Sequence, residues 1–341
     1  MKIGMLTGGG DCPGLNQAIR GIILRSMDFG YEIVGLRDGW AGLVNGLTMP
    51  IDIKTADELI AKGGTILGSS RTNPFKKEAE DVPKCLENFK KLGLDALIAI
   101  GGEDTLGVAN KFNKKGLKVV GVPKTMDNDL SATDYTFGFD TASTLSMEAV
   151  ERLRDTGKSH HRIMVLEVMG RHAGWVALFT GIASGADWIL LPEKKADLEE
   201  MCAHLKKAWD RKKYGIVVAS EGIEFLEDEG KEQEKDSFGH VILKSRGVAE
   251  RLEKEIEKRT GIEARSAVIG HMQRGGSPTL FDRMLGLRVG VKAIELIKEG
   301  KFGMMACLRG TKVEGVPLDE AVSKLKTVDE EWWSLAKVFF K

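Results

Sequence analysis

Three glycine-rich turns directly follow apolar segments that have the length and composition of buried strands. They are Gly8-Gly9-Gly10 with Asp11, Gly101-Gly102 with Glu103 and Asp104, and Gly170 with Arg171. Ligands of open parallel sheets bind at the carboxyl ends of strands. Glycine there lets backbone N–H groups approach phosphate oxygens, and the following helix N-terminus favours negative charge. One glycine pair alone more often makes only a tight turn. Together with the features below, however, these loops predict a phosphate-binding site.

A further polar segment, PKTMDND at 123–129, follows another apolar run. Its carboxylates Asp127 and Asp129 are two residues apart and lie beside Lys124 and Thr125. At the end of a strand, one carboxylate could accept a proton from a sugar hydroxyl and the other could help to hold a metal ion. Asn and Asp also favour solvated turns, so this segment alone leaves both interpretations open.

Four arginines lie at or beside predicted strand ends. They are Arg162, Arg171, Arg265 and Arg274. A planar guanidinium donates two parallel hydrogen bonds to a phosphate, so four of them in a chain of zero formal net charge indicate phosphate recognition. His271, in HMQRGG at 271–276, could be a metal ligand, a catalytic base or a structural histidine. We favour a hydrogen bond from His271 to a ligand oxygen.

Alternating strands and helices are predicted to position these residues. The predicted strands are 2–7, 32–36, 94–100, 117–122, 162–168, 188–191, 215–220 and 264–270. The predicted helices are 14–27, 84–92, a short helix between Gly102 and the strand at 117, and 141–154, 173–184, 197–212, 243–259 and 283–299. Short apolar strands joined by helices indicate mainly parallel sheets with helices on both faces. Residues 226–237 are nearly all polar and predict a solvated loop. A chain of 341 residues suggests two domains or one large α/β unit, and the order of the elements fits two α/β domains with the chain crossing between them.

The composition is that of a globular protein, with 42% hydrophobic and 29% charged residues. Lys plus Arg and Asp plus Glu both total 50, so no basic excess supports nucleic-acid binding. The four cysteines are widely spaced, which predicts reduced thiols rather than a zinc site. No apolar run approaches the roughly 20 residues of a membrane span, and Met1 and Lys2 lead straight into a strand. A cytoplasmic protein with no membrane partner is therefore expected.

Taken in order, the motifs resemble the 6-phosphofructokinase family. The matching segments are TGGGDCPGLNQAIRG (7–21), GGTILGSSR (63–71), GGEDT (101–105), PKTMDND (123–129), FGFDTA (137–142), MGRHAG (169–174), SEG (220–222) and GHMQRGG (270–276). Each motif is weak to moderate alone, but their common order from about residue 2 to 290 is very specific.

The family resemblance implies two three-layer α/β domains with mainly parallel sheets and an active site in the cleft between them. Residues 1–140 plus about 272–320 would bind the phosphoryl donor. Residues 141–271 plus about 321–341 would bind fructose 6-phosphate. Such a site suits phosphoryl transfer, in which the protein mainly positions groups and neutralises charge.

The resemblance also implies roles for individual residues. Asp127 would take the proton from the sugar 1-hydroxyl, flanked by Thr125 and Asp129, and Arg171 would stabilise the transferring phosphoryl group. The residues implied to bind fructose 6-phosphate are Thr125, Met126, Asp127, Arg162, Met169, Gly170, Arg171, Glu221, Arg265, His271, Met272, Gln273 and Arg274. Those implied to bind the donor are Gly9, Gly10, Arg71, Gly102, Asp104, Thr105 and Lys124, with Glu103 near Mg²⁺. Arg162 and Arg265 match residues that reach a neighbouring subunit's sugar phosphate, which implies a homodimer or homotetramer with shared active sites.

Two positions bear on the phosphoryl donor. ATP-using members usually carry glycine where this chain has Asp104 and Lys124, and the Asp–Lys combination resembles the pyrophosphate-dependent branch. A carboxylate ~4 Å from a nucleotide α-phosphate would repel it by about 4 kcal/mol at an effective dielectric constant of about 20, roughly a thousandfold in binding. Lys124 could pair with pyrophosphate or stabilise the leaving phosphate. The resemblance to the pyrophosphate-dependent branch therefore implies that Asp104 and Lys124 are both catalytic residues. The resemblance therefore implies reversible, Mg²⁺-dependent transfer from pyrophosphate to fructose 6-phosphate, giving fructose 1,6-bisphosphate and phosphate.

Several alternatives stay open. An ATP-dependent 6-phosphofructokinase is the first, and it applies if Asp104 and Lys124 pair only with each other. A nicotinamide-dependent oxidoreductase should carry GxGxxG, which TGGGDCPGLN is not. A non-catalytic sugar-phosphate-binding subunit should lack Asp127, which is present. Sedoheptulose 7-phosphate is an alternative acceptor.

The resemblance also bears on regulation. Allosteric members bind a nucleotide effector with several arginines, some of them on the first helix. Arg20 matches one such position, but Leu24 stands at the second, and Asp187 replaces the usual Glu. Weak or absent nucleotide regulation is therefore expected.

Overall fold

A computed structural model describes residues 1–225 and 247–340 of the chain. It contains two compact units. Unit 1 comprises Met1–Met126, Leu130–Asp140 and Arg274–Leu325, and unit 2 comprises the described residues of Asp127–Asp129, Thr141–Gln273 and Lys326–Lys341. The assignment of the phosphoryl donor to one domain and fructose 6-phosphate to the other stays a prediction.

Unit 1 is built on a seven-stranded sheet with the order β11-β10-β5-β4-β1-β2-β3. The strands are β1 (Lys2–Thr7), β2 (Glu32–Leu36), β3 (Thr48–Pro50), β4 (Ala96–Gly101), β5 (Val119–Pro123), β10 (Met304–Arg309) and β11 (Lys312–Pro317). The neighbours from β10 to β2 are parallel, while β3 and β11 pair antiparallel at the edges. From β1 the chain continues to β2 on one side, and from β4 it continues to β5 on the other. The topological switch point therefore lies between β1 and β4, where open α/β sheets bind ligands.

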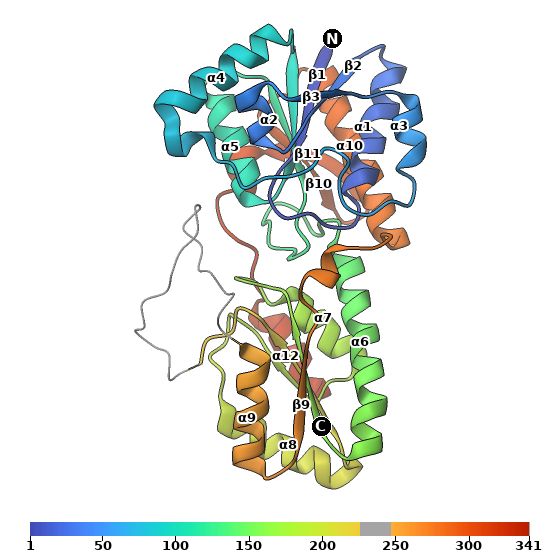
Figure 1. Ribbon diagram of the computed structural model, residues 1–341, viewed down its shortest axis with the longest axis vertical. Coiled ribbons are helices and arrows are strands. Elements are labelled where there is room, and N and C mark those ends of the chain that lie inside the picture. Colours follow the sequence, from blue (N-terminus) through green and yellow to red (C-terminus); the bar gives the residue numbers. More distant parts are fainter. Residues whose placement is uncertain (226–246, 341) are drawn as a thin grey trace. The chain divides into compact units, whose positions relative to one another are not determined.

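Helices cover both faces of this sheet (Figure 1). They are α1 (Leu15–Asp28), α2 (Trp40–Asn45), α3 (Ile53–Glu58), η1 (Pro74–Lys77), α4 (Glu78–Lys91), α5 (Glu103–Lys114), α10 (Leu280–Lys298) and α11 (Leu318–Ala321). Helices α1, α3 and α10 lie on one face, and α2, α4 and α5 lie on the other. Helices α1 and α10 approach closely through glycine, since a Cβ on Gly290 would lie 2.3 Å from the Ala18 carbonyl oxygen. This contact anchors the helix that follows the first glycine turn.

Unit 2 is built on a parallel sheet with the order β7-β8-β6-β9. Its strands are β6 (Ile163–Val168), β7 (Trp188–Leu190), β8 (Gly215–Ser220) and β9 (Ala264–Val268). Its helices are α6 (which begins in unit 1, Phe139–His160), α7 (Trp175–Ser184), α8 (Leu198–Lys212), α9 (Val248–Thr260), η3 (Gly270–Arg274, whose last residue belongs to unit 1) and α12 (Glu330–Phe339). Apolar side chains of α8 and α9 form a core with β6, β7 and β8. On α12, the Trp332 ring packs 6.0 Å from Trp175 and 5.1 Å from Phe179 of α7, centroid to centroid.

The predicted α/β class with mainly parallel sheets is confirmed, while several element bounds differ. Helix α6 runs to His160, beyond the predicted end at 154. The predicted strand 264–270 ends at Val268, because Gly270, with φ 49°, begins η3. The predicted loop 226–237 and the first residues of the predicted helix 243–259 lie outside the described residues. No prediction was made for β3, β10, β11, α2, α3, η1, η3, α11 or α12.

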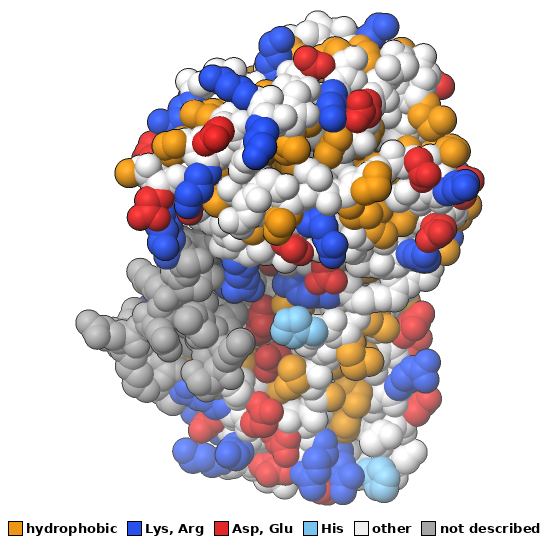
Figure 2. Space-filling model, turned by 45° about the horizontal axis from the view of Figure 1, so that its top comes forward, with side chains coloured by type: hydrophobic (Ala, Val, Ile, Leu, Met, Phe, Trp, Pro, Cys, Tyr) orange, Lys and Arg blue, Asp and Glu red, His pale blue; other side chains and the backbone are white. Residues whose placement is uncertain are grey.

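The charges are mixed over the surface. On the face drawn in Figure 2, both acidic and basic side chains are spread over much of the described surface, in line with the equal totals of 50. Across residues 1–225 and 247–340, no helix has the length and hydropathy needed to cross a membrane.

Candidate functional site

The first glycine loop, Gly8–Asp11, lies at the topological switch point of unit 1. The Gly8 N–H donates to the Ile100 carbonyl at the end of β4, with an N–O distance of 2.9 Å. The Gly9 N–H donates to the Ser70 carbonyl at 3.1 Å, and the Ser69 hydroxyl donates to the Gly9 carbonyl. Gly9 has φ +78°, a left-handed conformation that glycine adopts without strain. These contacts fix the loop across two parallel strand ends.

Lys124 brings a buried positive charge to this loop. It follows β5 directly, its side chain is 4% exposed, and its N–H donates to the Gly101 carbonyl at 2.9 Å. Its Nζ donates to the Gly10 carbonyl at 2.5 Å. A Cβ on Gly9 would lie 3.4 Å from the same Nζ. Because a buried ammonium needs polar partners, the loop and Lys124 stabilise each other, and the loop lies next to a fixed positive charge.

Arg274 approaches the same loop from the far end of the sequence. Its Nη1 donates to the Asp11 carbonyl at 3.0 Å, across 263 residues of chain. A Cβ on Gly10 would lie 2.3 Å from this Nη1, so a larger residue there would displace the guanidinium from this position. The sequence analysis gave Arg274 a role in sugar-phosphate binding and missed this contact. No spacing signal could have found it, because the two segments are remote in the chain.

The amino terminus of α5 completes the group in unit 1. Gly102 caps the helix, and Glu103 and Asp104 occupy its first turn. Thr105 is 4% exposed, and a Cβ on Gly8 would lie 2.5 Å from its Oγ1. Arg71, which is exposed, directly follows the Ser69–Ser70 segment that bonds the loop. The structure therefore gathers Gly9, Gly10, Thr105, Lys124 and Arg274, with the two acidic side chains at the helix terminus.

Cys12 lies just beyond the first glycine loop. Its Sγ donates to the Phe137 carbonyl at 3.4 Å, and burial raises the pKa of the thiol to about 12. The thiolate is the nucleophilic form of cysteine. Burial therefore favours the neutral thiol of Cys12 over the thiolate.

In unit 2, the Gly170 loop (Met169–Arg171) follows β6. The Met169 N–H donates to Gln273 Oε1 at 2.8 Å, and Gln273 Nε2 donates to Ser146 Oγ at 2.8 Å. Gln273 is fully buried. Its side chain thus links the loop to both η3 and α6 through one amide.

Glu221 and Ser220 fix the rest of the Gly170 loop. The Gly170 N–H donates to Glu221 Oε1 at 3.4 Å, and the Ser220 hydroxyl donates to the Gly170 carbonyl. Gly170 has φ +142°, and a Cβ there would lie 2.7 Å from Ser220 Oγ. The sequence analysis predicted Glu221 in this group but assigned no role to Ser220. Met169, Gly170, Glu221 and Gln273 are thus brought together.

The other predicted residues of this region differ in exposure. Arg171 is partly exposed at the end of the loop, while His271 and Met272 are exposed on η3. Met272 has a relative exposure of 69%. His271 and Met272 are thus available for binding, and η3, which carries them, is held in place by the hydrogen bonds of the buried Gln273.

The segment Thr125–Asp129 carries the candidate catalytic carboxylates. The Thr125 carbonyl accepts the Thr136 hydroxyl at 2.5 Å, and Met126 is 2% exposed. Asp127 and Asp129 are partly exposed, and they flank a buried Asn128 with φ +52°. Thr125 and Met126 belong to unit 1, whereas Asp127–Asp129 belongs to unit 2. The left-handed residue turns the chain sharply between the two carboxylates.

Arg162 and Arg265 lie at the opposite end of the unit 2 strands from the Gly170 loop. Arg162 precedes β6 and Arg265 is the second residue of β9, whereas the loop follows β6 after six residues. At about 3.3 Å per residue, Arg265, which pairs with Met164 of β6, lies roughly 17–20 Å from Met169 and Gly170, and Arg162 lies roughly 23–26 Å from them. One chain therefore does not bring these arginines to its own Gly170 loop.

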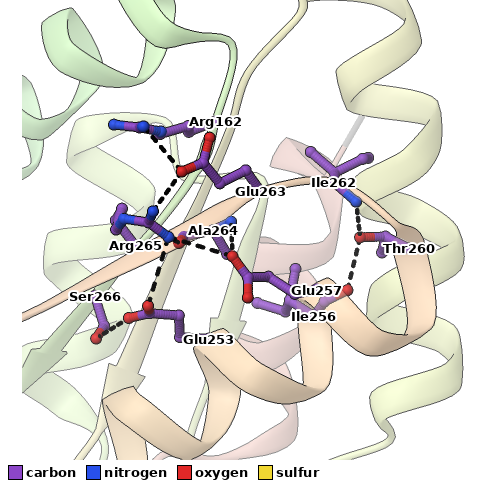
Figure 3. Close-up of polar contacts among 10 residues, drawn as sticks. All are labelled: Arg162, Glu253, Ile256, Glu257, Thr260, Ile262, Glu263, Ala264, Arg265 and Ser266. Carbon is purple, nitrogen blue, oxygen red and sulfur yellow. Dashed lines mark hydrogen bonds and ion pairs between the residues drawn. The ribbon is translucent and has the colours of Figure 1, made fainter.

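Carboxylates hold both arginines in place (Figure 3). Glu263 Oε1 accepts from Arg162 Nη2 at 2.9 Å and from Arg265 Nη2. Arg265 Nη1 also lies 3.3 Å from Glu257 Oε1. The hydrogen bond from Arg162, with the charges of Arg162 and Arg265, holds the pKa of Glu263 below its usual range. Glu263 therefore stays charged and orients the pair.

Three similarities to known proteins accord with this geometry. The sequence profile of the family described as phosphofructokinase matches residues 2–297. The chain is 53% identical to the pyrophosphate–fructose 6-phosphate 1-phosphotransferase of Dictyoglomus thermophilum, over 100% of this chain and 99% of that protein. It is also 46% identical to ATP-dependent 6-phosphofructokinase 3 of Streptomyces coelicolor, over 99% of both chains. Relatives named for both donors are thus similar to this chain over its whole length.

Solved structures give the same fold. The phosphofructokinase of Pichia pastoris in its T-state matches 99% of this chain and 36% of that chain, with a TM-score of 0.82 and 28% identity. The pyrophosphate-dependent phosphofructokinase of Marinobacter aquaeolei matches 97% of this chain and 86% of that chain, with a TM-score of 0.83. Its 23% identity supports the fold alone. By its sequence profile, its relatives and its fold, this chain belongs to the phosphofructokinase family.

Proposed function

We propose that this chain is a pyrophosphate-dependent 6-phosphofructokinase, which transfers a phosphoryl group from pyrophosphate to the 1-hydroxyl of fructose 6-phosphate. The products are fructose 1,6-bisphosphate and phosphate. Relatives that are 50–53% identical over this whole chain carry the name pyrophosphate–fructose 6-phosphate 1-phosphotransferase. The ATP-dependent relatives are 44–47% identical. Because this difference is small, the choice of donor depends on the site.

The observation that carries this choice is the buried Lys124 at the first glycine loop, with Asp104 in the first turn of the adjacent α5. The Lys124 ammonium and the Arg274 guanidinium both bond this loop, so a compact, highly charged anion meets two fixed cations. The Asp104 carboxylate opposes any further phosphate near the helix terminus. Pyrophosphate matches this short cationic site, whereas a nucleotide carries an additional phosphate toward a negative side chain.

Mg²⁺ would accompany the donor, and Glu103 is the residue proposed to hold it. Among the described residues, no group of three or more His, Cys, Asp or Glu side chains forms a metal cage. This fits Mg²⁺, which keeps several waters and is usually bound through one or two carboxylates plus the substrate phosphates. When bound, the ion would neutralise charge on the pyrophosphate oxygens.

Phosphoryl transfer leaves the protein with positioning and charge stabilisation as its main tasks. In this proposal Asp127 accepts the proton of the sugar 1-hydroxyl as that oxygen bonds to the phosphorus. Arg171 stabilises the equatorial oxygens of the transferring group, and Lys124 stabilises the phosphate that leaves. The Gly170 loop, Glu221 and η3 orient fructose 6-phosphate.

We also propose a homodimer or homotetramer with shared sites, and the position of Arg162 and Arg265 supports this. Both lie roughly 17–26 Å along the strands from the Gly170 loop of their own chain and are oriented by Glu263. In this proposal they bind the 6-phosphate held by a neighbouring subunit. A cytoplasmic setting accords with four buried free cysteines.

The direct test compares turnover with pyrophosphate and with ATP at matched free Mg²⁺. We expect pyrophosphate to support turnover at least about a hundredfold faster, from the charge repulsion estimated for Asp104. Equal or faster turnover with ATP would overturn the choice of donor. Asp104→Gly combined with Lys124→Gly should abolish pyrophosphate use, and Asp104→Asn tests the charge at nearly constant volume. Lys114→Gln, which removes a surface ammonium paired with Asp319, serves as the control.

A further inference from the structure

Lys326 contacts the Asp127–Asp129 segment through both its backbone and its side chain. Its N–H donates to the Asp129 carbonyl at 2.7 Å, and its Nζ donates to Asn128 Oδ1 at 3.1 Å. Asn128 is 2% exposed, so the ammonium reaches a buried amide. The two contacts fix the segment on either side of the peptide that joins Asn128 to Asp129.

The same residue also bonds the start of α7, which follows the Gly170 loop. The Lys326 carbonyl accepts from Trp175 Nε1 at 2.8 Å, and the Lys326 Nζ lies 5.7 Å from the centroid of the Trp175 ring. Trp175 is 6% exposed and is four residues beyond Arg171. One residue thus links the segment that holds Asp127 to the helix that begins beyond Arg171.

Glu193 reinforces this link from a second direction. Its Oε1 accepts from the Gly174 N–H at 2.9 Å and from the Val328 N–H at 2.8 Å. A Cβ on Gly174 would lie 2.9 Å from Glu193 Oε2, so the carboxylate is fitted closely to the backbone. Residues 326–328 are therefore linked to the start of α7 twice, directly at Trp175 and through the Glu193 carboxylate at Gly174.

We propose that Lys326 is a positioning residue that sets the location of the Asp127 carboxylate relative to Arg171. This inference rests on the proposed function, in which Asp127 accepts the proton of the sugar hydroxyl and Arg171 stabilises the charge of the transferring phosphoryl group. Lys326 lies beyond residue 297, where the match to the family profile ends, and no sequence motif pointed to it. All the contacts named lie within unit 2. Lys326 touches neither substrate in this proposal, so it acts through Asn128 and Trp175.

The test is Lys326→Met, which keeps an unbranched apolar side chain and removes the ammonium. Because misplacing a reacting group by about 1 Å costs up to a hundredfold, we expect kcat to fall between about tenfold and a hundredfold. The KM for fructose 6-phosphate should stay within about twofold, since the binding residues are untouched. Lys326→Arg, which can still donate to Asn128, should recover most of kcat.

A double-mutant cycle separates positioning from folding. Asn128→Gly suits the φ of +52° and removes the acceptor, so its combination with Lys326→Met should lower kcat no further than the larger single effect. It also supplies an independent variant if Lys326→Met folds poorly. Lys194→Met is the control, because Lys194 pairs with Glu330 of the same C-terminal segment. Its kcat should match that of the unaltered enzyme.

Two results would overturn the proposal. One is a kcat for Lys326→Met within about twofold of the unaltered enzyme, and the other is an additive cycle. Failure of the unaltered enzyme with pyrophosphate would instead contradict the proposed donor. The same variants would then be compared with ATP, because Asp127 acts on the sugar hydroxyl with either donor.

Discussion

Asp127 is the residue on which the proposed chemistry depends most directly. Replacing it by Ser removes the proton acceptor but leaves the Gly170 loop and Gln273 in place. We expect kcat to fall by about a thousandfold, while the dissociation constant for fructose 6-phosphate, measured by calorimetry, changes little. Asp155→Ser, at an exposed position on α6, is the matched control. A catalytic loss smaller than about tenfold would remove Asp127 from the role of base.

Asp187 determines a second expectation, which concerns regulation. Its carboxylate accepts from Lys212 Nζ at 2.8 Å and from the Ile216 N–H at 2.8 Å, and it is 4% exposed. Both oxygens therefore serve contacts within the chain, and Leu24 provides no guanidinium at its position. We expect ADP or phosphoenolpyruvate to shift half-saturation by fructose 6-phosphate by less than about twofold. Saturation curves with and without each effector check this, and a large shift would contradict it.

Two helix glycines have opposite environments, so the same substitution should have opposite effects. Gly107 lies inside α5, and nothing lies within 4 Å of a Cβ built on it, whereas a Cβ on Gly290 of α10 would lie 2.3 Å from the Ala18 carbonyl oxygen. Gly107→Ala should stabilise by about 0.5–1 kcal/mol through helix propensity. Gly290→Ala should destabilise by about 1–3 kcal/mol, because α1 and α10 must separate. Guanidinium unfolding midpoints measure both, and equal shifts would contradict the close contact.

Elements bounded by strong local signals were predictable from sequence. The predicted strands 2–7 and 215–220 coincide with β1 and β8, because both are apolar runs buried on both faces. Strand β11 is different, since it lies at the sheet edge and Val316 is the one buried residue of its sequence KVEGVP. Helix α12 was missed although the sequence carries its signal, because Trp332, Leu335, Ala336 and Phe339 recur at helical spacing. Edge strands such as β11 carry little signal of their own.

The candidate site divides in the same way. The glycine loops and the PKTMDND segment were predictable, because each ends a strand and carries its functional groups locally. The contact of Arg274 with Asp11 spans 263 residues, and that of Lys326 with Asn128 spans 198. Such contacts depend on the order of the strands in the sheet and on the path by which the C-terminal part of the chain packs back onto earlier segments. Neither can be deduced from composition or from the spacing of residues. The sequence named Arg274 but not its partner, and it did not name Lys326.

At the scale of the whole molecule, each unit presents a glycine loop at the carboxyl end of a parallel strand. The first glycine loop is bonded by Lys124 and Arg274, and the Gly170 loop by Gln273 and Glu221. Arg162 and Arg265 lie at the other end of the unit 2 sheet, so they do not complete the site of their own chain. In the proposed function, a second copy of the chain therefore completes the sugar-phosphate site.

Mixing two defective variants tests this dependence. Asp127→Ser removes the base from a chain's own site, and Arg265→Ser removes a phosphate contact donated to the neighbour. A hybrid dimer holds one site with both residues intact. When equal amounts of the two variants are dissociated and reassociated, about half of the dimers are hybrids, and one of the two sites in each hybrid is intact. Activity should therefore recover to about a quarter of that of the unaltered enzyme. Each variant reassociated alone is the control. If the mixture gains no activity over the mean of the two controls, Arg265 does not serve a neighbouring site.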